Sequence, residues 1–220
     1  MVATVRCISN PTDKEIDTCT DVIYEAFGGR FSFLSELGND KALLKPYIRA
    51  RLMAGFIGGE VHVLELPDVG IVGAATWFGP GQGFLLTTEQ RAAGWDDIMS
   101  KVGEPCRQWW DYGLRLLSES QEKYYGAGVH LDSYHLQMLG IHSQYQKKGY
   151  GTALLDFGEL RAAADSRSVV LETTGNSAVP FYKALGYTVF GPDEIEMLDS
   201  QETVPGYWFQ KKFVKDGVDH

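Results

Sequence analysis

The sequence has few of the residues that build disulfide frameworks or zinc sites. Its three cysteines, Cys7, Cys19 and Cys106, are widely spaced, odd in number and not paired with histidines at metal-ligand spacing. Disulfide-rich domains and structural zinc sites need closely spaced, paired ligands. These cysteines are therefore predicted to be reduced and structural, and nothing in the sequence indicates a metal.

Long apolar runs and an excess of basic residues are also missing. No segment approaches the roughly 20 apolar residues that span a bilayer, and residues 1–6 lack the charged-then-apolar pattern of a signal peptide. The formal net charge of −9 disfavours binding to nucleic acid, which depends on basic patches. We therefore expect a cytoplasmic protein with neither nucleic-acid nor membrane partners.

The chain does contain enough apolar sequence for one core. Because 44% of its 220 residues are hydrophobic, residues 1–220 are expected to form a single domain. Two strand-like runs, 60–66 and 71–78, are separated by turn residues and predict a hairpin. The pattern then breaks, which indicates an insertion at about 79–130. A stripe of apolar residues that includes Trp109 and Trp110 predicts a helix in its second half.

Periodic apolar residues predict the other elements. Before the hairpin, the expected elements are a strand over 5–8 and helices over 13–27 and 41–53. After the insertion, they are a strand over 134–141, a helix from Thr152, a strand over 168–173, a helix from Ser177 to Gly186, and strands over 187–190 and 207–213. The core face of the helix that starts at Thr152 is expected to carry Ala153, Leu154, Phe157, Leu160 and Ala164.

The segment Gln146-Lys147-Lys148-Gly149-Tyr150-Gly151 joins an expected strand to an expected helix. Its glycines allow a sharp turn, and exposed amides at a helix N-terminus favour an anion. The segment therefore predicts a ligand that carries phosphate. A dinucleotide fingerprint is excluded because Leu154 stands where the third glycine would fall, and no P-loop sequence occurs in the chain.

The remaining pattern, Gln-x-x-Gly-x-Gly, is similar to the pyrophosphate loop of the GNAT superfamily of N-acetyltransferases. Residues 171–187, LETTGNSAVPFYKALGY, resemble the second CoA-contacting motif of that family at the expected distance. The specific resemblance covers residues 136–187. In addition, the segment 77–81, Trp-Phe-Gly-Pro-Gly, and the Trp109-Trp110 pair resemble uncharacterised fungal members of the superfamily.

The resemblance implies a fold and an activity. The fold would be an α/β fold of the α+β type, the GNAT-like acyl-CoA N-acyltransferase fold. It would have a mixed, mostly antiparallel sheet of about six to seven strands flanked by helices, with a helical insertion between strands 3 and 4. The activity would be direct transfer of acetyl from acetyl-CoA to a primary amine of a small molecule, by a monomer or homodimer and without a metal. Acetylation of protein N-termini or lysines, or a non-catalytic acetyl-CoA sensor, are the alternatives.

The resemblance also assigns cofactor-binding residues. The backbones of Leu139 and Ile141 would bind the thioester carbonyl and pantetheine, and the Asn176 side chain would bind pantetheine. The pyrophosphate would lie on the main chain of Gln146, Lys147, Lys148, Gly149, Tyr150, Gly151 and Thr152. The N-terminal helices would form one wall of the acceptor cleft.

Three residues are candidates for proton transfer. Tyr182 matches the family tyrosine that lies near the CoA sulfur, so it is expected to contact the cofactor and to protonate the departing thiolate. His135 is the preferred base because an imidazole titrates near neutral pH and because it precedes Ile141 at the spacing where some members carry a glutamate. Glu172 on the neighbouring strand, or bulk water, is the alternative.

Overall fold

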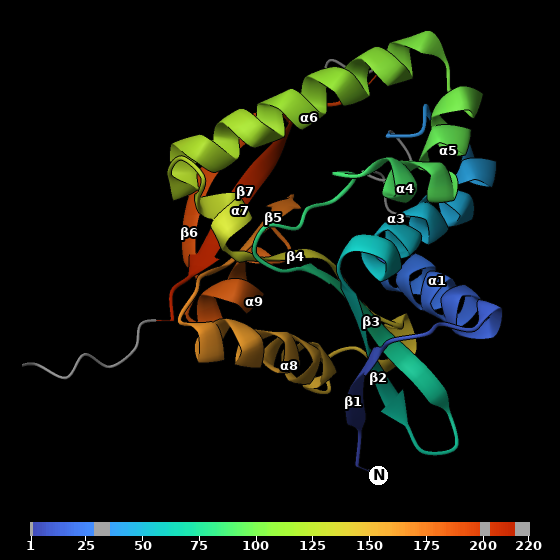
Figure 1. Cartoon of the computed structure of the whole chain (residues 1–220), viewed down its shortest axis with the longest axis vertical. Helices are drawn as coiled ribbons and strands as arrows, with labels where there is room; N and C mark the ends of the chain where they lie inside the picture. The colour runs from blue at the N-terminus through green and yellow to red at the C-terminus, as the bar shows by residue number, and fades with distance from the viewer. Residues whose placement is uncertain (1, 29–35, 199–202, 214–220) are drawn as a thin grey trace, which may run out of the picture.

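The computed structural model describes residues 2–28, 36–198 and 203–213 (Figure 1). The elements before the insertion are β1 (Thr4–Ile8), α1 (Asp13–Phe27), η1 (Lys41–Leu43), α3 (Leu44–Gly58), β2 (Glu60–Leu66) and β3 (Gly70–Phe78). The insertion holds α4 (Thr88–Gln90), η2 (Arg91–Trp95), α5 (Asp96–Lys101), α6 (Glu104–Tyr125) and α7 (Val129–Asp132). The remaining elements are β4 (Tyr134–Ile141), η3 (Ser143–Tyr145), α8 (Tyr150–Asp165), β5 (Val169–Thr174), α9 (Val179–Ala184), β6 (Thr188–Glu196) and β7 (Thr203–Lys211).

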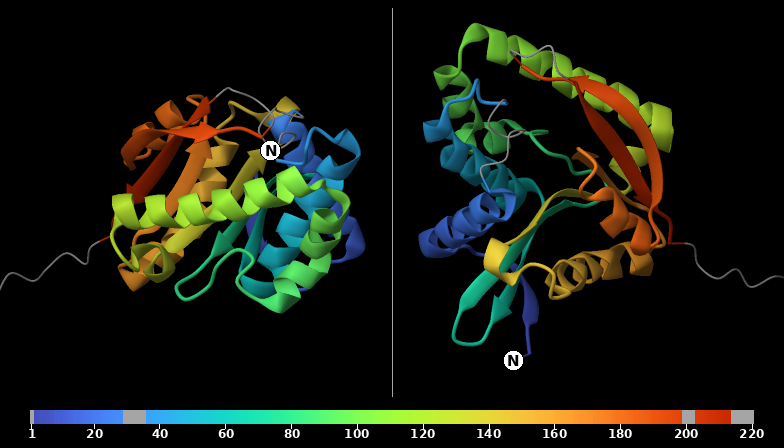
Figure 2. Two further views of the ribbon diagram at one scale, coloured as in Figure 1. Left: turned by 90° about the horizontal axis from the view of Figure 1, so that it is seen from above. Right: turned by 180° about the vertical axis from the view of Figure 1, so that it is seen from behind.

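The strands form one seven-stranded sheet in the order β1-β2-β3-β4-β5-β7-β6. Each neighbouring pair is antiparallel except β4 and β5, which are parallel. Helices α1 and α3 pack on one face, and α8 and α9 pack on the other (Figures 1 and 2). This arrangement confirms the predicted mixed, mostly antiparallel sheet flanked by helices.

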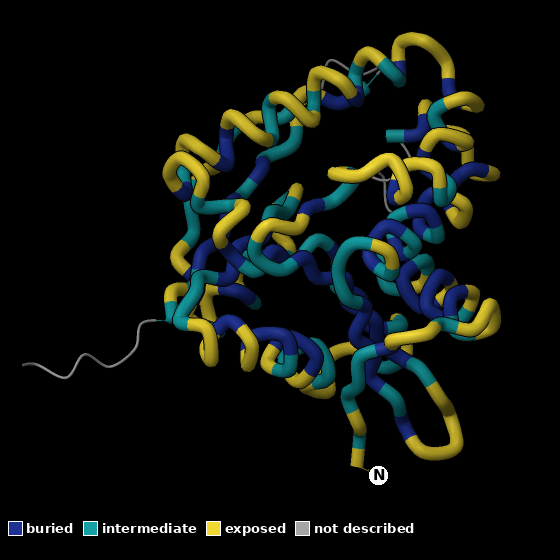
Figure 3. The backbone as a smooth tube through the Cα atoms, viewed as in Figure 1, coloured by how far each residue is buried: buried dark blue, intermediate teal, exposed yellow. Residues whose placement is uncertain are grey.

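The insertion between β3 and β4 is helical, as expected, and α6 is its longest element. Helix α6 runs from the side of α3 and α5 to the side of β6 and β7 (Figure 1). Much of its surface is exposed, whereas the middle of the sheet is buried (Figure 3). Among the described residues, no helix is long and apolar enough to cross a membrane.

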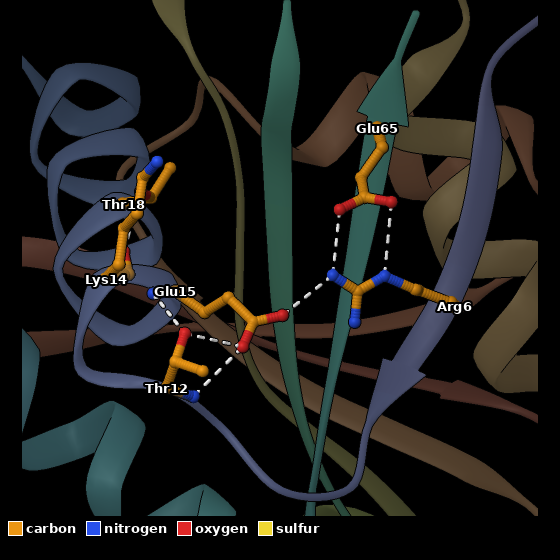
Figure 4. A network of polar contacts seen from close by, with 6 residues as sticks. All are labelled: Arg6, Thr12, Lys14, Glu15, Thr18 and Glu65. Atoms are coloured by element: carbon orange, nitrogen blue, oxygen red, sulfur yellow. Dashed lines mark hydrogen bonds and ion pairs between the residues drawn. The ribbon is translucent and has the colours of Figure 1, made fainter.

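Helix α1 begins with a capping box that is linked to the sheet. The Thr12 hydroxyl accepts a hydrogen bond from the Glu15 amide at 3.2 Å, and Glu15 Oε2 accepts from the Thr12 amide at 2.9 Å. Arg6 of β1 donates to Glu15 at 2.9 Å and to both carboxylate oxygens of Glu65 on β2 at 2.8 and 3.1 Å (Figure 4). These contacts hold the start of α1 against the first two strands.

Replacing Thr12 with alanine is expected to lower the free energy of unfolding by about 1 kcal/mol, because it removes the side-chain cap of α1. Urea denaturation followed by circular dichroism measures this change. Thr18→Ala is the matched control, since the Thr18 hydroxyl only donates to the Lys14 carbonyl within the helix at 2.7 Å. Equal losses in the two variants would show that the cap contributes nothing specific.

The predicted core face of α8 was partly wrong. Three residues expected to be buried are exposed: Ala153, Leu160 and Ala164. The helix instead turns Gly158 and Glu159 toward the protein, because Gly158 packs closely on the Trp77 ring and Glu159 accepts a hydrogen bond from Tyr187 at 2.7 Å. Apolar residues occur on all sides of this helix, so spacing alone did not determine which side is buried.

Several predicted boundaries also differ. Helix α8 begins at Tyr150 and not at Thr152, and α3 continues beyond residue 53 to Gly58. Helix α9 covers Val179–Ala184, whereas the sequence placed this helix from Ser177 to Gly186. The last two strands are β6 over Thr188–Glu196 and β7 over Thr203–Lys211, whereas the sequence placed them at 187–190 and 207–213.

Candidate active site

Strands β4 and β5 separate in the middle of the sheet. They pair only at Tyr134 with Val169 and at His135 with Val170, although β4 continues to Ile141 and β5 to Thr174. A cavity of about 750 Å³ lies beside the unpaired end of β4. We call it the first cavity. Leu139, Gly140 and Ile141 of β4 line it, as do Ala26 and Phe27 of α1.

Residues 146–152, which we call the glycine loop, border the first cavity. The lining residues are Gln146, Lys147, Gly149, Gly151 and Thr152. Gly149 precedes α8 with a left-handed φ of 80°, and no side chain of the described residues caps this helix. The Ala153 amide donates to the Gly149 carbonyl at 3.0 Å. Because the amides before Ala153 take no partner within the helix, they offer donors and the positive end of the helix dipole to an anion.

The Gln146 side chain holds the loop in place. Its Nε2 donates to the Ile141 carbonyl at 2.9 Å and to the Ala26 carbonyl at 3.3 Å. Its main-chain amide bonds to the Ser143 carbonyl at 3.5 Å. Two other loop residues, Lys148 and Tyr150, do not line the cavity, and the Lys148 ammonium lies 5.3 Å from the centre of the Tyr145 ring.

A second cavity of about 320 Å³ lies between β4, β5 and β7. Residues that line both cavities are Phe27, Leu139, Ser177, Ala178 and Tyr182. The two cavities therefore meet beside Tyr182, where the strands separate.

Tyr182 is buried at this junction and packs against aromatic rings. The centres of the Phe181, Tyr187 and Phe209 rings lie 5.0, 5.5 and 5.0 Å from the centre of its ring. Burial raises the pKa of Tyr182 above its ordinary value, so the phenol is protonated at neutral pH. No hydrogen bond joins its hydroxyl to another described residue. Tyr182 is more deeply buried than its neighbours Phe181 and Leu185.

Glu172 lines the second cavity and is held by three side chains. Its Oε2 lies 2.8 Å from His135 Nε2, and its Oε1 accepts from the Tyr125 hydroxyl at 3.0 Å and from Gln121 Nε2 at 3.1 Å. Burial opposes its charge, but His135 and the hydrogen bond from Gln121 outweigh burial and place the pKa below its ordinary value. The carboxylate is therefore ionised at neutral pH.

His135 is buried and lines neither cavity, so Glu172 lies between it and the second cavity. The ring of His130 packs against the ring of His135, with the ring centres 4.5 Å apart. Burial and the neighbouring His135 lower the pKa of His130 to about 4. The two sequence-predicted base candidates thus form one pair, and only Glu172 faces the space for a substrate.

Asn176 is another predicted cofactor-binding residue that the structure places outside the two cavities. Its side chain is exposed, lines neither cavity and accepts a hydrogen bond from the Tyr207 hydroxyl at 2.7 Å. Its neighbours Ser177 and Ala178 line both cavities. A contact of Asn176 with pantetheine stays a prediction.

Sequence reasoning missed the charged residues of the second cavity that come from outside the two motifs. Arg51 of α3 and Glu36 line it, and the Tyr47 hydroxyl bonds to both. Gln121 and Tyr125 of α6 hold Glu172. An arginine among the apolar residues of α3 was a signal for Arg51, whereas nothing in the sequence placed α6 beside β5.

A sequence profile described as an acetyltransferase (GNAT) domain matches residues 87–197. The match includes the glycine loop, the separated strands, Glu172 and Tyr182, and it spans half of the chain. The chain belongs to the GNAT acetyltransferase family. It is therefore an acyltransferase, and the fold and family expected from the sequence are confirmed.

Solved structures of GNAT proteins have the same fold. An acetyltransferase from Corynebacterium glutamicum, described with histone acetyltransferases, has a TM-score of 0.61 at 20% identity over 94% of this chain and 96% of its own. A polyamine N-acetyltransferase from Drosophila melanogaster has a TM-score of 0.61 at 14% identity over 96% of this chain and 100% of its own. An arylalkylamine N-acetyltransferase from Aedes aegypti has a TM-score of 0.61 at 14% identity over 96% of this chain and 99% of its own.

These identities establish the fold alone. A search of curated protein sequences gives no match. The resemblance to fungal members of the family stays a prediction.

Proposed function

We propose that this GNAT protein transfers the acetyl group of acetyl-CoA directly to the primary amine of a small molecule. The observation that carries the proposal is the junction of two cavities at Tyr182, with an anion-binding loop on one and the ionised Glu172 on the other. The GNAT family uses acetyl-CoA as its acyl donor. The first cavity suits the pyrophosphate and pantetheine of CoA, and the second suits an amine that enters as a cation.

The chemistry at the junction needs three functions. The amine nitrogen attacks the thioester carbonyl, whose oxygen accepts backbone hydrogen bonds from the end of β4 at Leu139 and Ile141. Before the attack, the ammonium group gives a proton to the Glu172–His135 pair, in which Glu172 faces the amine and its Oε2 lies 2.8 Å from His135 Nε2. The thiolate leaves with the proton of the buried Tyr182 hydroxyl.

The test is a screen of small primary amines, peptides with free N-termini and lysine peptides, with acetyl-CoA as donor and CoA thiol release as the signal. We expect thiol release and an N-acetylated product with small amines. Release with peptides alone would identify a protein acetyltransferase. Binding of acetyl-CoA in calorimetry without release for any acceptor would identify a sensor.

Gly149→Asp is expected to weaken acetyl-CoA binding by about 10-fold or more, because it adds a negative charge beside the pyrophosphate and strains the left-handed backbone. Calorimetry measures the dissociation constant. The matched control is Gly128→Asp, since Gly128 also precedes a helix, has a φ of 75° and lies outside both cavities. Unchanged acetyl-CoA affinity in Gly149→Asp would contradict the assignment of the loop.

We also propose that the protein acts without a metal, as a monomer or homodimer in the cytoplasm, and without nucleic-acid or membrane partners. Residues 1–220 act as one domain.

A further inference from the structure

A third cavity adjoins the second cavity and lies against α6. It has a volume of about 550 Å³, and we call it the α6 chamber. It shares six lining residues with the second cavity: Glu36, Arg51, Leu117, Thr174, Ile195 and Trp208. A molecule whose amine lies beside Glu172 can therefore extend into the α6 chamber.

The walls of the α6 chamber are mainly aromatic and aliphatic. Trp109 and Trp110 lie edge to face with their ring centres 5.3 Å apart, and Leu117 continues the same side of the helix. Both indole N–H groups are already bonded, that of Trp109 to the Glu196 carbonyl at 3.0 Å and that of Trp110 to the Glu36 carbonyl at 2.8 Å. These side chains thus present apolar ring surface to an occupant, which favours an apolar group and above all an aromatic one.

The charged groups around the second cavity and the α6 chamber favour a cationic ligand over an anionic one. Acidic residues line both cavities: Glu172 lines the second cavity, and Asp193, Glu194 and Glu196 line the α6 chamber. The cation that lines both, Arg51, is already engaged by Glu36, 3.8 Å from its Oε2, and by the Tyr47 hydroxyl. An acceptor with a carboxylate of its own would meet this surplus of negative charge, whereas an ammonium group is attracted by it.

We propose that the acceptor is a primary amine with an apolar, preferably aromatic, body, and that the α6 chamber binds this body while the amine faces Glu172. The inference rests on the proposed function, because it names the acceptor class of the same site. It makes the inserted helix α6 the element that selects the acceptor.

Gly113 offers a way to fill the α6 chamber from α6. It lines the chamber, and a Cβ atom built on it would meet no other atom within 4 Å. Its φ is not left-handed, so a larger side chain fits the helix without backbone strain. Leucine also favours a helix more than glycine does, which keeps the variant folded.

The experiment compares kcat/KM for 2-phenylethylamine and ethylamine, which carry the same reactive group on bodies of different size. The parent is expected to prefer 2-phenylethylamine by about 10- to 100-fold, the range for burying one phenyl group. Gly113→Leu is expected to reduce this preference about 10-fold by occupying the space of the ring. Ser118→Leu is the matched control, because Ser118 is an exposed residue of α6 outside all three cavities.

The outcomes separate this inference from the proposed function. Equal kcat/KM for the two amines, or equal changes of preference in Gly113→Leu and Ser118→Leu, would overturn the inference and leave the proposed function standing. Acetylation of neither amine, nor of any other small amine in the screen, would overturn both.

Discussion

Tyr182→Phe is expected to lower kcat about 100-fold, the usual loss when a general acid is removed. The phenol lies where the two cavities meet, and burial keeps it protonated until the thiolate forms. Phenylalanine keeps the ring contacts with Tyr187 and Phe209, so the fold and the affinity for acetyl-CoA should be preserved. Steady-state kinetics under conditions where chemistry limits the rate, together with calorimetry, separate these effects.

Tyr134→Phe is a matched control for the loss of a hydroxyl. The Tyr134 hydroxyl donates to Asp165 at 2.6 Å and lies outside the first and second cavities. We expect this variant to turn over at the parental rate. If Tyr182→Phe did the same, the thiolate would leave without a proton from Tyr182, and the role of that residue would be packing alone.

Glu172→Gln is expected to lower kcat/KM by about 10²-fold or more. The amide keeps the size of the side chain, but it removes the negative charge that faces the ammonium group and interrupts the path to His135. Because the pKa of Glu172 lies below its ordinary value, the parent should keep this charge across neutral pH. Initial rates with a reactive amine at several pH values measure the loss.

His135→Gln distinguishes the two members of the pair. Glutamine can still donate a hydrogen bond to Glu172, but its amide cannot accept a proton as an imidazole can. If His135 is the final proton acceptor, this variant should change the shape of the pH profile as well as its height. If the pH profiles of Glu172→Gln and His135→Gln both match that of the parent, the amine proton passes to bulk water.

The parts of the site that could be predicted from the sequence are those set by local backbone geometry. The glycine loop needs a left-handed residue before a helix, and Gly149 supplies it with a φ of 80°. Strand 134–141 was predicted with its observed bounds, and Glu172 was correctly placed on the strand beside it, although its contact with His135 was not predicted. Short segments with distinctive residues determine these features.

The parts that could not be predicted depend on packing between distant segments. Arg51 lines the second cavity only because α3 packs on the same face of the sheet as α1. The buried side of α8 is set by the contact of Gly158 with Trp77 from another strand. The α6 chamber likewise needs the insertion to cross from α5 to β6, which no local pattern specifies.

The central claim is that the acetyl group passes directly between the two cavities that meet at Tyr182. Initial rates of CoA thiol release, with acetyl-CoA and 2-phenylethylamine varied together, test it most directly. Direct transfer predicts release that requires both substrates and double-reciprocal lines that intersect. Parallel lines, or a burst of CoA thiol equal to the enzyme concentration before any amine is added, would show a covalent acetyl-enzyme and contradict the account.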